Sequence, residues 1–360
     1  MKIKECPNTF SCDFTQYPDT VWLKCREKPF TIYGLYKPYE SEHFMRIPQE
    51  VAERTNDGVK DLNYQTSGGR ITFSTDSPYI AIHSVQPTFN IMRHMPRSGN
   101  AGFDLYLCDE YKEQIYAGSL FASVSKNEYY YTTVNSRTSL GKKQNYVLNF
   151  PLYERCDDVY IGFHPDSEVD VFEDAYTGDA PLVFYGSSIT QGGCVSRPGL
   201  VYTAHISRKY HRDYINLGFS GSCKGEDAIC EYMAGLNMSV FVCDYDHNAP
   251  NPDHLRKTHY KVYETIRKKQ PDLPYVMVSK PDVLWYPGFI ENKNIIIDSY
   301  SKALALGDKN VYFVDGSSFF EGDYYDSCTV DTTHPNDLGH YLMAKYIGET
   351  IGEIISKEKQ

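Results

Sequence analysis

The stretch LVFYGSSITQGG, residues 182–193, decides the fold of the second half of this chain. Its apolar run has the character of a buried strand, and the run stops at Gly186. Two serines follow, Ser187 and Ser188. Small hydroxyl residues at such a turn have two explanations. Either they only shape the turn, or one of them is held at the end of the strand to react.

Apolar runs of the same type recur four more times along the chain, and helix-length amphipathic segments separate them. Strands rich in β-branched residues that alternate with helices are typical of a parallel sheet covered on both faces. We therefore predict a three-layer, mostly parallel α/β domain. The runs are LVFYG, YINLG, VFVCD, YVMVS and VYFVD, and the helices are expected at 199–210, 226–236, 253–269, 290–306 and 337–356.

The first half of the chain has the pattern of a β domain. Residues 70–74 and 79–84 alternate apolar and polar side chains and are separated by the turn-prone sequence TDSP. Segments 101–110 and 157–164 are similar short strands, and a short helical turn is expected only near 49–55. Many short strands with turn signals between them indicate a sandwich or jelly roll.

The length of 360 residues suits two domains better than one. The change from the β pattern to the α/β pattern falls at about 175–180. We therefore expect an all-β, jelly-roll-like sandwich at 1–176 and an α/β domain at 177–360.

The composition excludes several classes of function. The formal net charge of −11 disfavours binding to nucleic acid or to an anionic membrane surface. No apolar stretch approaches the roughly 18 residues that a membrane span needs. The beginning of the chain, MKIKECPNTFSCDF, lacks the apolar segment of a signal peptide. If this is the whole natural chain, we expect it to stay in the cytoplasm.

The loops that follow the predicted parallel strands carry the residues of an acyl-transfer site. In a parallel sheet the carboxyl ends of the strands meet at one edge, where reactive residues gather. Ser188 follows the first strand, Gly221 follows the second and Asn248 the third, while Asp331 and His334 precede the last helix. A serine, a histidine that takes its proton, a carboxylate that orients the histidine, and N–H donors are the parts that acyl transfer needs.

These blocks resemble the SGNH (GDSL-like) hydrolase family. YGSSIT is similar to the first block of that family and places Ser188 at the nucleophile position. NLGFSG is similar to the second block, and DTTHPNDLGH to the last, Asp-x-x-His-Pro. GFDLYL, residues 102–107, resembles the GxDLY motif of a subfamily with a β-sandwich before the hydrolase domain. The resemblance thus covers nearly the whole chain.

The resemblance implies a flavodoxin-like catalytic domain with a triad of Ser188, Asp331 and His334. It implies an oxyanion hole formed by Ser188, Gly221 and Asn248. Two features depart from the family pattern. Ser187 stands where aspartate is common, and the third block, DYDHN, lacks the usual glycine and the following aspartate. The role of Asn248 is therefore the least secure of these assignments.

Each candidate residue also has a structural explanation. Ser188 could be a turn or helix-cap serine, and Asp331 could cap the last helix. Gly221 could be an ordinary turn glycine, and Asn248 a loop residue that bonds its own backbone. The occurrence of all these residues in order, at strand ends, favours the catalytic interpretation.

A metal site is the main chemical alternative. Asp331 and His334 could combine with Asp246 and His247, but a hydrolytic zinc site needs three protein ligands and an open position. The serine and glycine loops would then have no role. We therefore expect neither a metal nor another cofactor.

The cysteines indicate packing rather than catalysis. The ten cysteines form no C-x-x-C pair, so a zinc ribbon or a redox motif has no support. We expect reduced and mostly buried thiols. Cys194 and Cys223 lie near the first and second loops in sequence, and we expect both to be packing residues.

The resemblance implies a serine esterase that removes small acyl groups, most often acetyl, from carbohydrate hydroxyls. Trp285 or Tyr286, after the fourth strand, could contact a sugar, and His247 could lie at the rim of the pocket. Two alternatives stay open: an acyltransferase that uses the same triad with a non-water acceptor, and a catalytically inactive carbohydrate-binding protein. The expected partner is a small-molecule or oligosaccharide acyl ester, and a homo-oligomer is compatible with the sequence.

Overall fold

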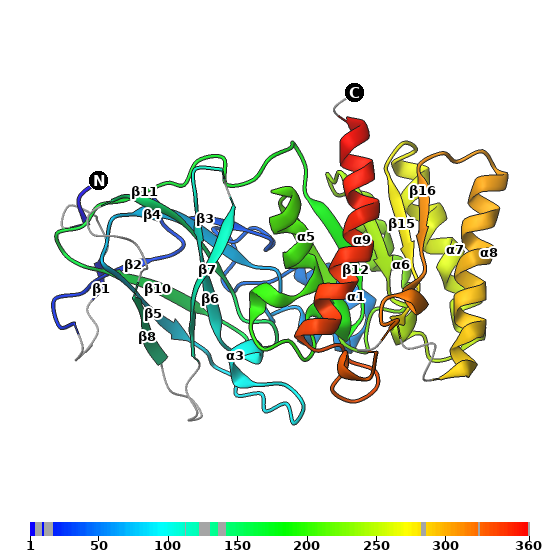
Figure 1. Ribbon diagram of the computed structural model, residues 1–360, viewed down its shortest axis with the longest axis horizontal. Helices are drawn as coiled ribbons and strands as arrows, with labels where there is room; N and C mark the ends of the chain where they lie inside the picture. The colour runs from blue at the N-terminus through cyan, green and yellow to red at the C-terminus, as the bar shows by residue number, and fades with distance from the viewer. Residues whose placement is uncertain are drawn as a thin grey trace. The chain divides into compact units, whose positions relative to one another are not determined.

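The computed structural model describes residues 1–3, 9–10, 17–111, 113–121, 130–135, 142–281, 286–322 and 325–358. The chain forms two compact units (Figure 1). The first contains Met1–Arg46, Tyr64–Thr177 and Ser196–Gly199. The second contains Ile47–Asn63, Gly178–Val195 and Leu200–Gln360. The main passage from the first unit to the second follows Thr177, close to the change of sequence pattern. Two short segments depart from the continuous ranges 1–176 and 177–360: Ile47–Asn63 is grouped with the second unit, and Ser196–Gly199 with the first.

The first unit contains two antiparallel sheets. One has the order β1 (Thr9–Phe10), β2 (Val21–Lys24), β10 (Asp158–Phe163), β5 (Tyr79–Val85) and β8 (Tyr130–Asn135). The other has the order β11 (Val169–Asp170), β4 (Arg70–Thr75), β9 (Gln144–Asn149), β6 (Phe103–Cys108) and β7 (Gln114–Leu120), and β3 (Thr31–Tyr33) pairs with β4. A short helix, α3 (Arg97–Asn100), precedes β6.

The core of the first unit lies between these two sheets. Ile82 and Ile161 come from one sheet, and Phe73, Leu105 and Leu148 come from the other, and all five side chains are fully buried in one apolar cluster. Period-2 alternation places such residues on one face of each strand. The prediction of a β-sandwich before the α/β domain is confirmed.

The second unit is built on a five-stranded parallel sheet of order β13-β12-β14-β15-β16. In chain order this is 2-1-3-4-5, the flavodoxin-like arrangement, whose order reverses at β12. The predicted α/β fold is confirmed, and all five predicted apolar runs form strands. Their bounds are β12 (Leu182–Gly186), β13 (Tyr214–Gly218), β14 (Val240–Asp244), β15 (Tyr275–Val278) and β16 (Val311–Val314).

Helices cover both faces of this sheet (Figure 1). One layer contains α1, α6, α7 and α8, whose apolar residues share a core with the sheet. The other layer contains α5 and α9, which pack against each other. The helices are α1 (Gln49–Thr55), α2 (Asp57–Leu62), α4 (Ser188–Gln191), α5 (Tyr202–Tyr210), α6 (Asp227–Ala234), α7 (Pro252–Lys269), α8 (Ile290–Ala305) and α9 (Asp337–Glu358).

Short 3-10 turns lie between these elements: η2 (Pro198–Leu200), η3 (Asp246–Asn248), η5 (Pro287–Phe289), η6 (Gly316–Ser318) and η7 (Tyr325–Ser327). The first of them changes one expectation. The helix expected from residue 199 begins at Tyr202, because the chain first makes the turn η2 at Pro198–Leu200.

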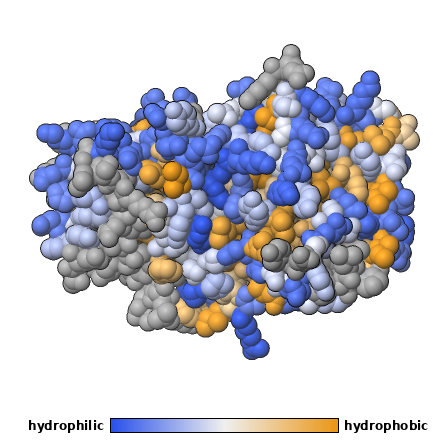
Figure 2. Space-filling model, in the orientation of Figure 1, coloured by the Kyte–Doolittle hydropathy of each residue, from blue (hydrophilic) through white to orange (hydrophobic). Residues whose placement is uncertain are grey.

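Among the described residues, none of the helices combines the length and apolar character that crossing a bilayer would require. The face drawn in Figure 2 mixes hydrophilic and hydrophobic side chains, and hydrophilic ones are abundant, as expected for a chain with 23% charged residues.

Two glycines allow α4 to lie directly on the ends of the strands. A Cβ atom added at Gly186 would come within 2.0 Å of Thr190 Oγ1 and 2.4 Å of the Asp244 carbonyl oxygen. One added at Gly218 would come within 2.2 Å of the Gln191 backbone nitrogen. Real Cβ atoms do not approach other atoms so closely, and glycine is the residue that permits such contacts. The start of α4 is thereby fixed against two neighbouring strands.

We expect Gly218→Ala to lower the free energy of unfolding by about 1–3 kcal/mol, because the added methyl group meets backbone atoms of α4 that have nowhere to move. Chemical denaturation measures this change. Gly235→Ala is the matched control, because its nearest non-neighbouring atom lies 3.4 Å from the added carbon. An equal loss of stability in both variants would contradict the close approach of α4.

Candidate active site

Ser188 is the first residue of α4, directly after β12. Its neighbour Ser187 caps this short helix, because Ser187 Oγ accepts a hydrogen bond from the Ile189 N–H at 3.1 Å. The helix ends after one turn at Gly192, whose φ of +110° lies in the region that glycine favours. The capping role is therefore taken by Ser187, and the Ser188 side chain is available for another contact.

That contact is with His334. Ser188 Oγ lies 2.9 Å from His334 Nε2, although the two residues are 146 positions apart in the chain. The other ring nitrogen, Nδ1, lies 2.8 Å from Asp331 Oδ2. The structure thus brings together the three residues predicted as a triad, in a continuous series of hydrogen bonds from hydroxyl to imidazole to carboxylate.

The loop before α9 holds Asp331 and His334 in this arrangement. Asp331 Oδ1 accepts hydrogen bonds from the backbone N–H groups of His334 at 2.7 Å and Thr333 at 3.1 Å. Thr332, which lies between Asp331 and Thr333 in the chain, adopts a φ of +68°. Such a backbone is uncommon for a residue other than glycine, and it closes the turn tightly enough for one carboxylate to bind both the backbone and the ring of His334.

The charge of Asp331 is stabilised by the same contacts. Burial acts to raise the pKa of Asp331, but the hydrogen bonds from His334 and Thr333 and the electrostatic attraction of His334 outweigh it, so the pKa lies below its ordinary value. The carboxylate is therefore ionised at neutral pH. An ionised carboxylate at Nδ1 keeps a proton on that nitrogen, so that Nε2 can accept a hydrogen bond from Ser188 Oγ.

The loop after β13 is held by hydrogen bonds at both ends of one peptide group. Gln191 Oε1 of α4 accepts from the Ser220 N–H at 2.9 Å. Asn248 Nδ2, from the loop after β14, donates to the Phe219 carbonyl oxygen at 3.0 Å. Both side chains are largely or fully buried. The 219–220 peptide plane is therefore fixed from two directions, and the next residue is Gly221.

Gly221 has a φ of +64°, and a Cβ atom there would meet open space. Among the described residues, no group accepts a hydrogen bond from the Gly221 N–H. Asn248 uses one amide hydrogen for Phe219, and within the same part of the chain no acceptor is recorded for the other. An exposed backbone N–H and a partly used amide are suitable donors for a negatively charged oxygen.

A buried polar network under α4 was not predicted from the sequence. Asp244, the last residue of β14, accepts hydrogen bonds at Oδ2 from Thr190 Oγ1 at 3.1 Å and Tyr202 OH at 3.0 Å. Burial raises the pKa of Asp244 well above its ordinary value. The only sequence signal was an acidic residue at the end of an apolar run. The network joins α4, β14 and α5.

His247 and Asp246 lie in η3, beside the candidate site. Burial first, and then the nearby charges of Lys280 and His334, hold the pKa of His247 well below its ordinary value, so its ring is neutral. Asp246 Oδ2 accepts from the Lys280 N–H at 3.1 Å. His247 thus carries no charge, and its contact with substrate stays a prediction.

Tyr286 lies near the same loop. Its hydroxyl is 2.7 Å from Thr332 Oγ1, and its side chain is 42% exposed. The ring is therefore accessible beside Asp331 and His334. Trp285, the other aromatic residue predicted to contact a sugar, lies outside the described residues.

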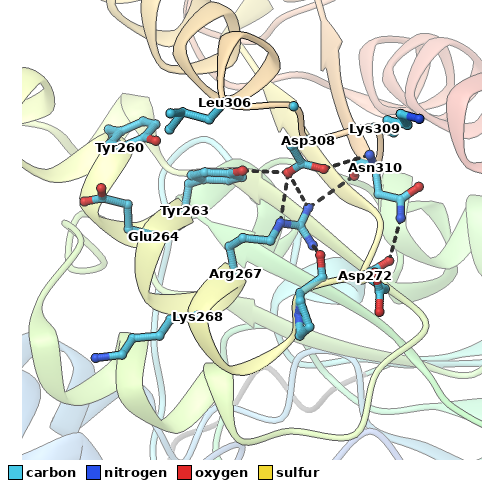
Figure 3. A pocket seen from close by; sticks show the side chains of 12 residues that line it. Tyr260, Tyr263, Glu264, Arg267, Lys268, Asp272, Leu306, Asp308, Lys309 and Asn310 are labelled. Atoms are coloured by element: carbon cyan, nitrogen blue, oxygen red, sulfur yellow. Dashed lines mark hydrogen bonds and ion pairs between the residues drawn. The ribbon is translucent and has the colours of Figure 1, made fainter.

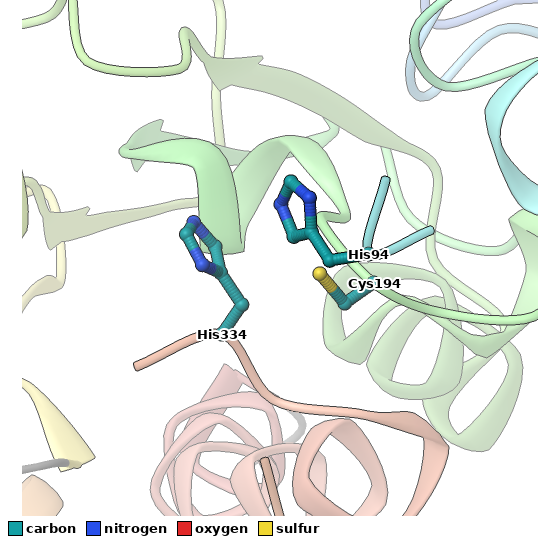
Figure 4. Close-up of side chains that lie close together, drawn as sticks. All are labelled: His94, Cys194 and His334. Atoms are coloured by element: carbon teal, nitrogen blue, oxygen red, sulfur yellow. The ribbon is translucent and has the colours of Figure 1, made fainter. Parts of the chain in front are cut away.

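The thiols nearest the site are buried. Burial first, and then the charge of Asp331, raise the pKa of Cys194 to about 12. Figure 4 shows Cys194 and His334 of the second unit. Cys223 is fully buried. All eight cysteines of the described residues are free and buried, so that expectation is confirmed for them: Cys25, Cys108, Cys156, Cys194, Cys223, Cys230, Cys243 and Cys328.

The metal alternative conflicts with the contacts of His334. Both of its ring nitrogens lie within hydrogen-bond distance of protein groups, Ser188 and Asp331. A metal at either nitrogen would have to replace one of these bonds.

A surface pocket of about 800 Å³ lies near the amino ends of β15 and β16, at the opposite ends of the strands from the loop that carries Ser188 (Figure 3). It is formed by the end of α7 and the loop that leads from α8 into β16. Arg267 in this pocket is bonded to Asp308 and to four backbone carbonyl groups, and Tyr263 OH also donates to Asp308. Arg267 and Asp308 thus stabilise the loop itself, and they are remote from the strand ends that carry Ser188.

Two protein families match the chain. Residues 179–351 match the GDSL-like Lipase/Acylhydrolase family. Residues 20–169 match the GxDLY family, the N-terminus of SGNH hydrolase-type esterases. No protein of curated function matches the sequence.

Solved structures with the same fold cover both units of the chain. A protein described as a GDSL-like lipase from Bacteroides ovatus is 26% identical, with a TM-score of 0.84 over 94% of this chain and 98% of that chain. The salicylyl-acyltransferase SsfX3 of a tetracycline biosynthetic pathway is 17% identical, with a TM-score of 0.74 over 91% and 95%. An acetyl xylan esterase from Butyrivibrio proteoclasticus is 11% identical, with a TM-score of 0.57 over 94% and 99%.

We expect the stability of Asp246→Asn relative to wild type to increase between about pH 4 and pH 7. Burial raises the pKa of Asp246 to about 6, against the opposing effects of Lys280 and backbone N–H groups. The unfolded chain ionises this residue near its ordinary value, about 3.9. The folded protein therefore loses stability as the pH rises between these two values, and an uncharged asparagine does not. The difference in melting temperature between variant and wild type measures the effect.

Asp315→Asn is the control, because the pKa of Asp315 is shifted in the opposite direction from that of Asp246. Burial acts to raise the pKa of Asp315, but hydrogen bonds from Ser317 and Lys293 outweigh it and lower the pKa. That carboxylate stabilises the fold above its ordinary pKa, so the penalty for Asp315→Asn should stay constant between about pH 5 and pH 7. A penalty for Asp246→Asn that is independent of pH would refute the raised pKa.

Proposed function

The chain belongs to the GDSL-like lipase/acylhydrolase family, with the N-terminal GxDLY domain of SGNH-type esterases, and from this premise we propose that it is a serine esterase acting on O-acylated carbohydrates. The observation that carries the proposal is the hydrogen-bond series from Ser188 through His334 to Asp331. It has the order and the geometry of a nucleophile, a general base and an orienting carboxylate.

In the proposed reaction, Ser188 Oγ attacks the acyl carbon of the ester while His334 Nε2 takes the hydroxyl proton. The tetrahedral intermediate collapses when His334 returns that proton to the departing sugar oxygen, and the acyl group stays on Ser188. Water then attacks the acyl carbon and gives a proton to His334. When this second tetrahedral intermediate collapses, His334 returns the proton to Ser188 Oγ and the carboxylic acid leaves. Asp331 stays ionised throughout and stabilises the imidazolium form of His334.

We assign the oxyanion hole to the backbone N–H groups of Ser188 and Gly221 and to the side-chain amide of Asn248. The support for Gly221 is its exposed N–H on a loop whose preceding peptide is fixed by two buried side chains. The support for Asn248 is that its amide group donates one hydrogen to the Phe219 carbonyl oxygen, which leaves the second hydrogen for the oxyanion. Fixed donors cost no reorganisation when the negative charge develops, which is why such a site accelerates the reaction.

An acetylated carbohydrate is the substrate class that we propose. One solved structure of the same two-part fold is an acetyl xylan esterase, although its 11% identity establishes the fold alone. The exposed ring of Tyr286 next to the Asp331–His334 loop offers a surface on which a sugar could stack. Trp285 and His247 are further candidates for contact with the sugar.

Acyl transfer to an alcohol other than water is the second candidate function. The salicylyl-acyltransferase SsfX3 shares the fold over 91% of this chain, and the same serine, histidine and carboxylate would serve both reactions. The two functions differ only in which acceptor reaches the acyl-enzyme. A catalytically inactive binding protein would not need the hydrogen-bond series at Ser188.

We expect the protein to release acetate from a chromogenic acetate ester and from acetylated xylo- or manno-oligosaccharides. Ser188→Ala should lower the rate by at least about a thousandfold while the protein stays folded, because the nucleophile is lost. Ser187→Ala is the matched control and should keep most of the activity. Acetate release by Ser188→Ala at the wild-type rate would refute the proposal. A rise in total turnover with added alcohol, with transfer exceeding hydrolysis, would favour the acyltransferase.

We expect Asn248→Ala to lower kcat by roughly 10²–10³ and to leave KM nearly unchanged, because an oxyanion donor binds the transition state more strongly than the substrate. Gln191→Met is the comparison variant, because it removes the hydrogen bond to Ser220 and leaves the Asn248 amide in place. If both variants show the same modest loss, Asn248 only holds the loop. If kcat of Asn248→Ala stays within about threefold of wild type, Asn248 is not an oxyanion donor.

A further inference from the structure

The Gly-Phe-Asp-Leu-Tyr motif of the first unit has no role in the reaction proposed above. It begins at Gly102 and continues into β6, where side chains alternate between the two faces of the sheet. Phe103 and Leu105 lie in the sandwich core. Asp104 and Tyr106 therefore lie on the opposite face, and Asp104 is fully buried there.

The buried carboxylate of Asp104 is bonded at both oxygens. Asn149, its direct partner across β9, donates from Nδ2 to Oδ1 at 2.8 Å. Oδ2 accepts from Arg197 Nη1 at 2.8 Å and from the Gly199 N–H at 2.9 Å. A buried carboxylate is tolerated only when it is paired and hydrogen-bonded. The buried Asp104 carboxylate therefore depends on the segment Ser196–Gly199 for the two hydrogen bonds to its Oδ2.

Arg197 also contacts the tyrosine of the same motif, Tyr106. Its guanidinium donates to the Tyr106 hydroxyl and lies 3.8 Å from the centre of the Tyr116 ring. Burial acts to lower the pKa of Arg197, but the attraction of Tyr106 and Asp104 outweighs it and raises the pKa. The arginine is therefore a fixed, charged partner of Asp104, held by planar contacts that a lysine could not reproduce.

Gly199 is seated directly on the two polar residues of the motif. A Cβ atom at Gly199 would come within 2.5 Å of the Tyr106 ring and hydroxyl and 2.8 Å of Asp104 Oδ2. A further tie lies at the other end of the segment, where Ser98 Oγ donates to the Ser196 carbonyl oxygen at 2.6 Å. The segment is thus held at its first, second and fourth residues.

This segment lies, in the chain, between the candidate nucleophile and α5. The chain leaves the second unit after Val195 and returns to it at Leu200. Three residues before Ser196, the Gly193 N–H donates to the Ser188 carbonyl oxygen at 2.8 Å. Between them, Cys194 adopts a φ of +74°, which is uncommon for a residue with a side chain and persists only where its surroundings fix it.

Only Cys194 and Val195 separate Gly193 from Ser196, and both are buried, so a displacement of the segment is passed along a short, packed stretch to the turn at Gly193. We propose that Asp104 of the Gly-x-Asp-Leu-Tyr motif is a positioning residue that anchors residues 196–199 and thereby holds the turn at Ser188 in its reactive geometry. Arg197 and Gly199 are its partners. The effect on catalysis rests on the esterase activity proposed above.

Asp104→Asn tests the anchor, because it removes the charge and keeps the shape. We expect kcat on a chromogenic acetate ester to fall about tenfold with little change in KM, and a fluorophosphonate probe to label Ser188 correspondingly more slowly. Arg197→Gln should show the same loss, and the double variant should be no worse than either single variant, because both act through one contact. Arg197→Lys should restore only part of the rate.

Asp158→Asn is the matched control. It breaks an ion pair of the same unit, between Lys24 and Asp158, on the other sheet, and it should keep the wild-type kcat. If Asp104→Asn does not fold, Gly199→Ala and Tyr106→Phe are used instead. Gly199→Ala disturbs the close packing of Gly199 on Tyr106 and Asp104, Tyr106→Phe removes the hydroxyl that Arg197 contacts, and both leave the Asp104 carboxylate in place. A kcat within twofold of wild type in all folded anchor variants would overturn the proposal, and so would an equal loss in Asp158→Asn.

Hydrogen–deuterium exchange separates this proposal from the proposed function. Backbone amides of residues 188–195 should exchange faster in Asp104→Asn than in wild type and in Asp158→Asn. This result does not depend on any enzymatic activity, so a wild-type protein without esterase activity would refute the function and leave the anchor supported. Unchanged exchange in every anchor variant would overturn the anchor, whatever the wild-type protein hydrolyses.

Discussion

The close approach of α4 to the ends of β12 and β13 is the constraint on which the second unit depends. Gly186 and Gly218 leave no space for a methyl group, so the first turn of α4 lies directly on the strand ends. That contact sets where Ser188 begins the helix and where Gln191 meets the Ser220 N–H. The residue that would attack an ester and the loop that would stabilise the negatively charged intermediate are thus fixed relative to one helix of four residues.

The polar groups around this turn are matched to each other in the interior of the protein. Asp244 accepts from Thr190 and Tyr202, and Asn248 and Gln191 hold the two ends of one peptide group. Buried polar groups are costly unless they are hydrogen-bonded, so each such network tolerates very few alternative arrangements. In an esterase, this rigidity is useful because donors that are already oriented lower the barrier more than mobile ones.

Most of the fold and the order of the candidate residues could be predicted from the sequence. The apolar runs beginning at Leu182, Tyr214 and Val240 formed the strands expected of them, because two-face burial leaves a continuous apolar signal. Ser188, Asp331 and His334 were predicted from their positions next to strand and helix ends, and the structure brings these three side chains together. The roles of Gln191, Asp244 and Arg197 were missed, because a buried glutamine, aspartate or arginine has no local pattern that distinguishes it from an exposed one.

The sequence by itself determined which residues form strands and helices, and which loops meet at the carboxyl edge of the sheet, because those properties follow from local periodicity and from the geometry of parallel strands. Only the tertiary structure decided the 2.9 Å contact between Ser188 and His334, the hold on the 219–220 peptide, and the pairing of Asp104 with Arg197. These contacts join residues 29 to 146 positions apart. Their partners are selected by burial and by hydrogen-bond geometry in three dimensions, which no short stretch of sequence records.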